Sequence, residues 1–133
     1  MKNRKKANPE PCPCESGLPY MDCCQPYIEQ TCDAPTAEAL MRSRYTAFVL
    51  RNEDYLRYSW HPDKCPADIR MNTDTTWLGL KVKTVVNGSV DDANGQVEFI
   101  ARSKNNGKAN RIHENSRFCR YNSRWVYIDG EFA

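Results

Sequence analysis

The sequence predicts an α+β fold, with helices first and an antiparallel sheet after them, behind a short cysteine-rich segment. Three observations support this prediction. Apolar residues recur at helical spacing after residue 35, apolar and polar residues alternate from Thr76 onward, and four cysteines lie between residues 12 and 24. Helices followed by a run of strands are typical of α+β proteins. The chain of 133 residues is long enough for one domain with a substantial core.

Two helices are expected at the start of this domain. The first runs from Pro35 to Asn52, with Thr36 as its N-cap and Glu38 in the first turn, where a carboxylate is favoured by the positive end of the helix dipole. The second runs from Glu53 to Trp60 and is ended by the prolines that follow it. The apolar residues of the first helix form one stripe that should be buried: Ala37, Leu40, Met41, Tyr45, Phe48 and Val49.

Strands are expected from Thr76 to the end of the chain. In the first strand, Leu78, Leu80 and Val82 should share one face, because side chains alternate between faces along a strand. Further strands are expected at residues 97–102, 112–121 and 125–129. The turns between strands are predicted at three dipeptides that favour a left-handed backbone: Asn94-Gly95, Asn106-Gly107 and Asn122-Ser123.

The cysteine segment is typical of a metal site. Cys12 and Cys14 form one close pair and Cys23 and Cys24 another, joined by a turn that contains Gly17. Four thiolates that converge on one ion suit tetrahedral zinc, and they leave no open position for a catalytic water. Disulfides are the alternative, but the chain has seven cysteines and begins with charged residues instead of an apolar signal segment. The sequence therefore predicts structural zinc and a cytoplasmic location.

The segment from Cys12 to Cys24 resembles the SEC-C motif, the zinc-binding tail of the SecA translocation ATPase. Cys12, Cys14 and Cys23 match the first three ligands of that motif, and Cys24 takes the place where some members have histidine. Glu15 departs from the pattern, because the motif usually has glycine there. In SecA-like proteins the resembling knuckle contacts a chaperone and the ribosome.

Four later segments resemble the YchJ family of bacterial proteins. They lie at residues 34–48, 58–62, 77–80 and 113–118. The resemblance implies a SEC-C knuckle with its basic tail at residues 1–26. It also implies a nuclear-transport-factor-2-like domain at residues 27–133, a cone of helices packed on a curved, mainly antiparallel sheet. The family carries no established biochemical role, so the resemblance predicts the fold more sharply than the function.

Cones of this type often keep a pocket between sheet and helices, and mildly polar aromatic walls suit a small apolar ligand. Alternatively, the same aromatic residues simply fill the core. His113 and Glu114 should point to opposite faces of a strand, so they do not form an acid–base pair. Arg42 or Arg44 is expected to reach a carboxylate of the sheet, Glu98 or Glu114. The predicted pocket residues are Tyr45, Trp60, His61, Trp77, Phe99, His113 and Trp125.

Two functions remain open at this stage. The first is a protein-interaction or adaptor module that contacts a protein, the ribosome or RNA through the knuckle, with apolar contact from Leu18, Tyr20 and Met21. The basic tail beside the knuckle would suit an acidic or RNA-bearing partner. The second is a small-ligand binder or a hydratase- or isomerase-like enzyme, which needs a polar residue with a shifted pKa inside the pocket. The two functions are discriminated by whether His61 or His113 points into an open cavity. No catalytic residue is predicted, no apolar stretch is long enough for a membrane span, and a net charge of +2 does not by itself indicate nucleic acid. The basic residues of the tail are Lys2, Arg4, Lys5 and Lys6.

Overall fold

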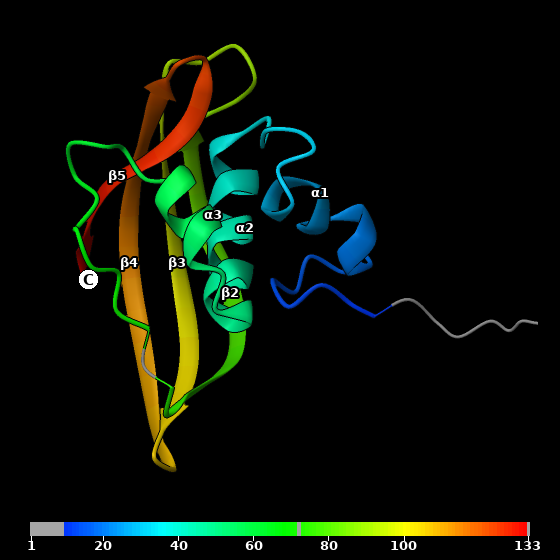
Figure 1. The fold of residues 1–133 in the computed structure, drawn as a ribbon, viewed down its shortest axis with the longest axis vertical. Coiled ribbons are helices and arrows are strands. Elements are labelled where there is room, and N and C mark those ends of the chain that lie inside the picture. The colour runs from blue at the N-terminus through cyan, green and yellow to red at the C-terminus, as the bar shows by residue number, and fades with distance from the viewer. Residues whose placement is uncertain (1–9, 72, 133) are drawn as a thin grey trace, which may run out of the picture.

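The computed structural model describes residues 10–71 and 73–132 and places helices against one face of a four-stranded antiparallel sheet (Figure 1). The α+β prediction is confirmed. The strands follow one another in space as they do in the sequence, in the order β2-β3-β4-β5. Their bounds are Thr75–Asn87 for β2, Asn94–Asn105 for β3, Lys108–Tyr121 for β4 and Arg124–Phe132 for β5. The basic residues of the tail, from Lys2 to Lys6, lie outside the described residues.

The main helix α2 (Ala37–Leu50) begins where the sequence predicts. The Thr36 side chain accepts a hydrogen bond from the Ala39 amide at 3.0 Å, which satisfies one of the free N–H groups at the helix start. The helix ends at Arg51, whose φ of 57° is left-handed. This turn redirects the chain into α3 (Glu53–Tyr58), which Asn52 caps in the same way as Thr36 caps α2.

Helix α3 is shorter than expected, because the residues after Tyr58 pair with strand β5. The Tyr127 amide donates to the Ser59 carbonyl, and the His61 amide donates to the Tyr127 carbonyl, both at 2.8 Å. Trp60 thus belongs to a short bridge to β5 and not to the helix. The pairing attaches the segment after α3 to the edge strand β5.

Strand β2 does not keep the simple alternation that the sequence suggests. Its register against β3 shifts between Trp77 and Gly79, so Leu78 occupies a bulge. Leu78 is consequently 40% exposed, and the prediction that it shares the buried face with Leu80 is wrong. Trp77 instead turns inward and packs edge-on against Tyr45, with ring centroids 5.7 Å apart. Because of the bulge, Trp77 and Leu80 both lie on the side of the sheet that packs against the helices.

The first hairpin turn also differs from the prediction. Strand β3 begins at Asn94, and the left-handed residues of the turn are Asn87 and Gly88, with φ of 56° and 80°. Gly95 is needed for close approach, because a Cβ there would lie 2.6 Å from the Gly88 Cα. The other two predicted turns are confirmed, since each of their residues has positive φ: Asn106, Gly107, Asn122 and Ser123.

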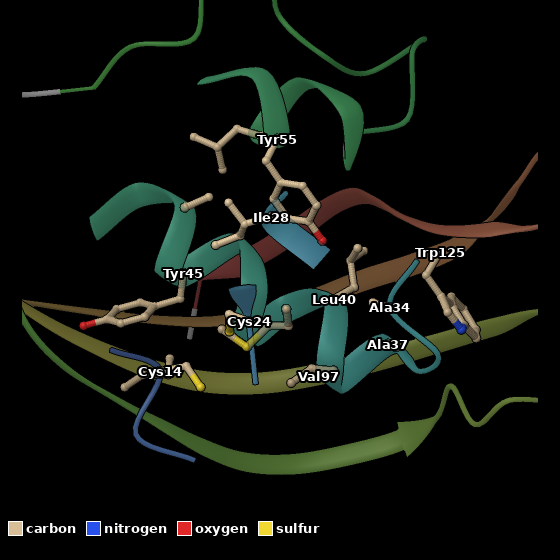
Figure 2. Close-up of a cluster of buried hydrophobic side chains, with 14 of the residues drawn as sticks. Cys14, Cys24, Ile28, Ala34, Ala37, Leu40, Tyr45, Tyr55, Val97 and Trp125 are labelled. Atoms are coloured by element: carbon tan, nitrogen blue, oxygen red, sulfur yellow. The ribbon is translucent and has the colours of Figure 1, made fainter. Parts of the chain in front are cut away.

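The cysteine segment packs on the same core as the helices. It contains the short helices η1 (Tyr20–Asp22) and α1 (Gln25–Ile28), and Figure 1 shows it beside α2. Cys14 and Cys24 lie in one buried cluster with Leu40 and Tyr45 (Figure 2). The expected division into units 1–26 and 27–133 stays a prediction. The structure adds that the two parts share one apolar core.

Candidate metal centre and interior cavity

The four N-terminal cysteines converge on one point. Their sulfur atoms all lie within 4.8 Å of one another. Cys23 Sγ is 3.6 Å from Cys14 Sγ and 3.9 Å from Cys24 Sγ. Tetrahedral zinc with bonds of about 2.3 Å separates its sulfur ligands by about 3.8 Å, so this spacing fits zinc. All of these cysteines are free, and a disulfide would need sulfurs about 2 Å apart.

Local turns produce the convergence. The Cys12 amide donates to the Leu18 carbonyl, and the Glu15 amide donates to the Cys12 carbonyl, each at 3.0 Å. Glu15 and Gly17 have φ of 62° and 90°, so the chain reverses through two left-handed residues between the pairs. The left-handed backbone at position 15 explains why the motif usually has glycine there, because glycine adopts positive φ without steric cost. Glu15 adopts the same conformation despite its side chain.

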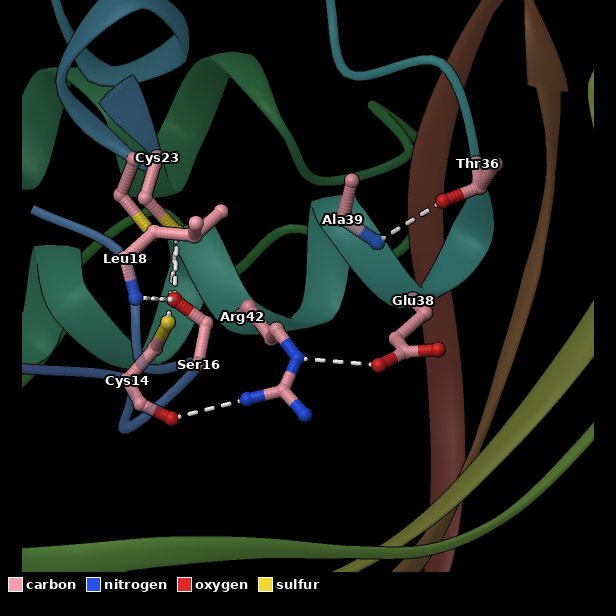
Figure 3. Close-up of polar contacts among 9 residues, drawn as sticks. Cys14, Ser16, Leu18, Cys23, Thr36, Glu38, Ala39 and Arg42 are labelled. Atoms are coloured by element: carbon pink, nitrogen blue, oxygen red, sulfur yellow. Dashed lines mark hydrogen bonds and ion pairs between the residues drawn. The ribbon is translucent and has the colours of Figure 1, made fainter. Parts of the chain in front are cut away.

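Side chains around the sulfurs hold them in place. Thr46 Oγ1 donates to Cys24 Sγ at 3.3 Å, and Ser16 Oγ lies 3.1 Å from Cys23 Sγ. Arg42 donates to the Cys14 carbonyl at 2.9 Å and pairs with Glu38, as Figure 3 shows. Such partners orient metal ligands, and Arg42 adds positive charge beside the thiol cluster.

Sequence analysis missed Thr46 and the contact of Arg42 with the knuckle. Their spacing is the signal that could have found them, because residues i and i+4 share one face of a helix. The sequence predicts that one of the two arginines, Arg42 or Arg44, reaches a carboxylate of the sheet. Arg42 pairs instead with Glu38 on its own helix, one turn earlier.

Each thiol of the cluster changes the pKa of its neighbours. Hydrogen bonds from Cys14 and Cys24 lower the pKa of Cys12 below its ordinary value. Burial raises the pKa of Cys23 to about 11. The negative charges of Cys14 and Cys12 raise the pKa of Cys23 further, so without a cation the ionisation of one thiol opposes the ionisation of its neighbours. A divalent ion would stabilise four thiolates at once and release their protons on binding. The four cysteines could thus hold zinc in a closed, structural site.

A separate cavity of about 270 Å³ lies between α2 and the sheet. Four of the seven predicted pocket residues line it: Tyr45, Trp60, Trp77 and Phe99. The other walls of the cavity are also mainly apolar. Besides the tyrosines, the polar residues that face it are Arg44, Glu114 and Ser116. The remaining lining residues are Met41, Arg44, Phe48, Ala101, Ile112, Glu114, Ser116, Phe118, Tyr127 and Phe132.

His61, His113 and Trp125 do not line this cavity, contrary to the prediction. The His61 ring packs edge-on against Tyr121. His113 lies on the other face of β4, because Ile112 and Glu114 on either side of it face the cavity. Its Nε2 contacts Glu98 Oε2 at 2.6 Å.

Trp125 is a core residue near the start of α2. It is 1% exposed, and its indole N–H donates to the Pro35 carbonyl at 3.1 Å. Figure 2 shows it beside Ala34 and Ala37. For Trp125 the alternative from the sequence, an aromatic residue that fills the core, is correct.

The cavity contains two charged residues that were not predicted to line it, Arg44 and Glu114. The expected ion pair between Arg44 and a sheet carboxylate is absent from the part of the chain that the structure describes. Glu114 Oε2 instead accepts from Ser116 at 2.7 Å and from the Tyr127 hydroxyl at 3.0 Å. Burial lowers the pKa of Arg44 to about 10, so it stays charged at neutral pH.

Comparisons with known proteins agree with this architecture. A family model described as "YchJ, middle NTF2-like domain" matches residues 36–130, and a SEC-C motif model matches residues 9–26. A UPF0225 protein of Cupriavidus pinatubonensis is 48% identical over 132 residues, covering 95% of this chain and 91% of that protein. A UPF0225 protein of Chromobacterium violaceum is 47% identical over the full length of both chains. The chain belongs to the YchJ (UPF0225) family.

Two solved structures share the fold. The solution structure of RPA3114, a SEC-C motif protein of Rhodopseudomonas palustris, is 34% identical with a TM-score of 0.82 and covers 92% of this chain and 98% of that one. The crystal structure of a SEC-C motif protein of Psychrobacter arcticus is 31% identical with a TM-score of 0.69, and the match covers 92% of this chain and 82% of that one. Across residues 10–71 and 73–132, no helix has the length and apolar character needed to span a membrane.

Proposed function

We propose that this member of the YchJ family binds one zinc ion at Cys12, Cys14, Cys23 and Cys24 and uses the zinc-held knuckle to contact a protein or ribosomal partner. One observation carries the proposal. Leu18 and Met21 are 51% and 59% exposed on the same loop whose cysteines are mostly buried. A rigid loop that presents apolar side chains is suited to recognition, because little conformational entropy is lost on binding.

The closed ligand set supports recognition over chemistry at this site. Four cysteine sulfurs lie within 4.8 Å of one another, and a tetrahedral zinc held by all four would have no coordination position for water or substrate. Tyr20, expected to be a third exposed contact residue, is only half-exposed and packs against the core. The proposed contact surface, called here the knuckle surface, therefore consists of Leu18 and Met21.

The resemblance to the SecA tail favours the ribosome or a chaperone as the partner. Four basic residues precede the motif in the sequence, so an acidic or RNA-bearing partner suits the charge of this end of the chain. The rival enzyme hypothesis needs a polar residue with a shifted pKa in the interior cavity, and the sequence offered His61 and His113. Neither histidine lines that cavity, and the carboxyl group that faces it belongs to Glu114.

The metal is tested by elemental analysis of purified protein. We expect one zinc per chain in the wild type and a large loss in Cys14→Ser, because Cys14 is fully buried in the cluster. Cys32→Ser is the matched control, since Cys32 is exposed and is not one of the clustered four. Wild-type protein that lacks zinc after preparation without chelators, or equal zinc in both variants, would contradict the proposed site.

The knuckle surface is tested by co-sedimentation with purified ribosomes. A double variant, Leu18→Ser with Met21→Ser, should lose binding while keeping one zinc per chain. The matched control is Leu50→Ser with Val86→Ser, which removes two side chains that are 48% and 51% exposed outside the knuckle. Binding should also weaken as salt rises if the basic tail contributes. Equal sedimentation of both double variants would remove the knuckle surface from the proposal, and a failure of wild-type protein to sediment would reject the ribosome as partner.

A further inference from the structure

The buried guanidinium of Arg44 is the most unusual feature of the interior cavity. Arg44 is 7% exposed, and its Nη1 donates to the Leu56 carbonyl at 2.9 Å and to Ser59 Oγ at 2.8 Å. Its guanidinium lies 4.7 Å from the Trp60 ring centroid and 4.6 Å from that of Tyr127. These neutral partners stabilise a buried cation less well than a carboxylate would.

A second donor lies beside it. The indole N–H of Trp60 is buried, and the described residues offer it no acceptor. A buried N–H without an acceptor destabilises the folded state, so native proteins seldom keep one without a reason. Trp60 lines the cavity and stacks on Arg44. One oxyanion could accept from both side chains at once.

The acidic residue of the cavity does not fill this role. Glu114 Oε2 accepts from the hydroxyls of Ser116 and Tyr127, and Glu114 is not in ion-pair contact with Arg44 within the described part of the chain. Tyr127 stands between the two charges, with its ring against Arg44 and its hydroxyl on Glu114. Arg44 is therefore not neutralised by an ion pair within the described residues, and its printed hydrogen bonds use only Nη1.

The other walls of the cavity indicate which kind of group could fill the rest of it. Phe48, Trp77, Phe99 and Phe118 present aromatic surface to the cavity. Its volume of about 270 Å³ is slightly below the usual range for drug-sized ligands, about 300–1,000 Å³. The ligand should therefore be small, mostly apolar and negatively charged at one end.

We propose that the interior cavity binds a small carboxylate with an apolar body, its carboxylate on Arg44 and the Trp60 indole N–H and its body against the aromatic walls. The inference is independent of the zinc site and of the knuckle surface. The carboxylate proposal could be wrong while the proposed function is right, and the reverse also holds. The reason is that the cavity lining contains none of the four clustered cysteines, nor Leu18 or Met21.

The test is calorimetric titration of the full-length protein with phenylacetate, 3-phenylpropionate and hexanoate. Two uncharged or cationic counterparts share one of these bodies, 3-phenylpropan-1-ol and 3-phenylpropylamine. We expect at least one carboxylate to bind, and to bind at least tenfold more tightly than its alcohol. If none of the three carboxylates binds at millimolar concentration, or if the amine binds more tightly than the acid, the proposal is wrong.

The place of binding is tested by the indole N–H signals in ¹⁵N NMR spectra. The Trp60 signal should shift on addition of the carboxylate, whereas the Trp125 signal should stay, because its N–H already donates to Pro35. Trp60→Phe, which keeps an aromatic ring but removes the donor, should weaken binding by roughly tenfold to a hundredfold. Trp77→Phe is the matched control in the same wall. Equal loss in both variants, or a stationary Trp60 signal, would overturn the assignment.

Discussion

The knuckle and the cavity lie on two faces of the same helix, and they differ in how the sequence encodes them. On α2, Arg42 and Thr46 face the knuckle, whereas Arg44 faces the cavity. The knuckle collects its four sulfurs from residues 12–24. The cavity collects Arg44 from α2, Trp60 from the loop after α3, Glu114 from β4 and Tyr127 from β5. A site whose residues are close in sequence can be recognised from their spacing. A site whose residues come from several helices and strands cannot.

The two regions also differ in charge. The knuckle concentrates thiols whose ionised forms repel one another, so it favours a cation. The cavity holds a buried guanidinium with no ion pair among the described residues, and the carboxyl of Glu114 faces it as well, so the proposed anion would have to bind on the side of Arg44 and Trp60. The comparison teaches that one helix can place charged and polar side chains in two separate environments, because Arg42 and Thr46 lie on one face and Arg44 on another.

Removal of the metal should have the largest effect and should fall on the knuckle. We expect a chelator to disorder residues 12–24 and to lower the melting temperature by about 10 °C, a loss of about 2 kcal/mol or more. The sheet should stay folded, because its hydrogen bonds lie within residues 75–132. Hydrogen exchange of the amides checks this. Collapse of protection in β3 and β4 on chelation would show that the two regions fold as one unit.

Thr46→Val should weaken zinc binding by about tenfold without unfolding the chain, because it removes the hydroxyl that donates to Cys24 but keeps the shape of the side chain. Competition with a chromophoric chelator measures the change. Thr46→Ser retains the hydroxyl and should bind zinc nearly as the wild type does. The cavity should be unaffected in both, so a parallel change in carboxylate binding would show that the two faces of α2 are coupled.

Glu15→Gly should stabilise the protein by about 0.5–1 kcal/mol, because Glu15 has a φ of 62° that glycine adopts without steric cost. Gly17→Ala, at a φ of 90°, should have the opposite sign and similar size. Urea unfolding of the zinc-loaded proteins measures both. A destabilised Glu15→Gly protein would mean that the Glu15 side chain contributes more than its backbone costs.

His113→Gln should have the smallest effect and should leave carboxylate binding unchanged, because His113 lies on the sheet face away from the cavity. Its hydrogen bond lowers the pKa of Glu98 below the ordinary 4.5. A carboxyl with a lowered folded pKa stabilises the fold above its ordinary pKa, and this contribution is lost as the pH falls through the lowered value. In the variant the Glu98 pKa should rise, which an NMR titration of the side chain detects. An altered cavity affinity would place His113 in the ligand site after all.

Much of the architecture could be predicted from local signals. Thr36 caps α2 as expected, and the turns at Asn106 and Asn122 have the left-handed backbone that their residue types favour. The four cysteines converge as their spacing suggests. In each case the physical cause acts over a few residues, so it is visible in the sequence.

The contents of the cavity could not be predicted in this way. The bulge at Leu78 turns Trp77 inward, and the pairing of Ser59 and His61 with Tyr127 brings Trp60 over Arg44. The sequence by itself determined the fold class, the helix cap and the convergence of the four cysteines. Only the tertiary structure decided that Arg44 is buried without a carboxylate partner among the described residues and that His113 faces away. Burial and charge pairing depend on which distant strands meet, and a change of one position in register reverses the face that a side chain occupies.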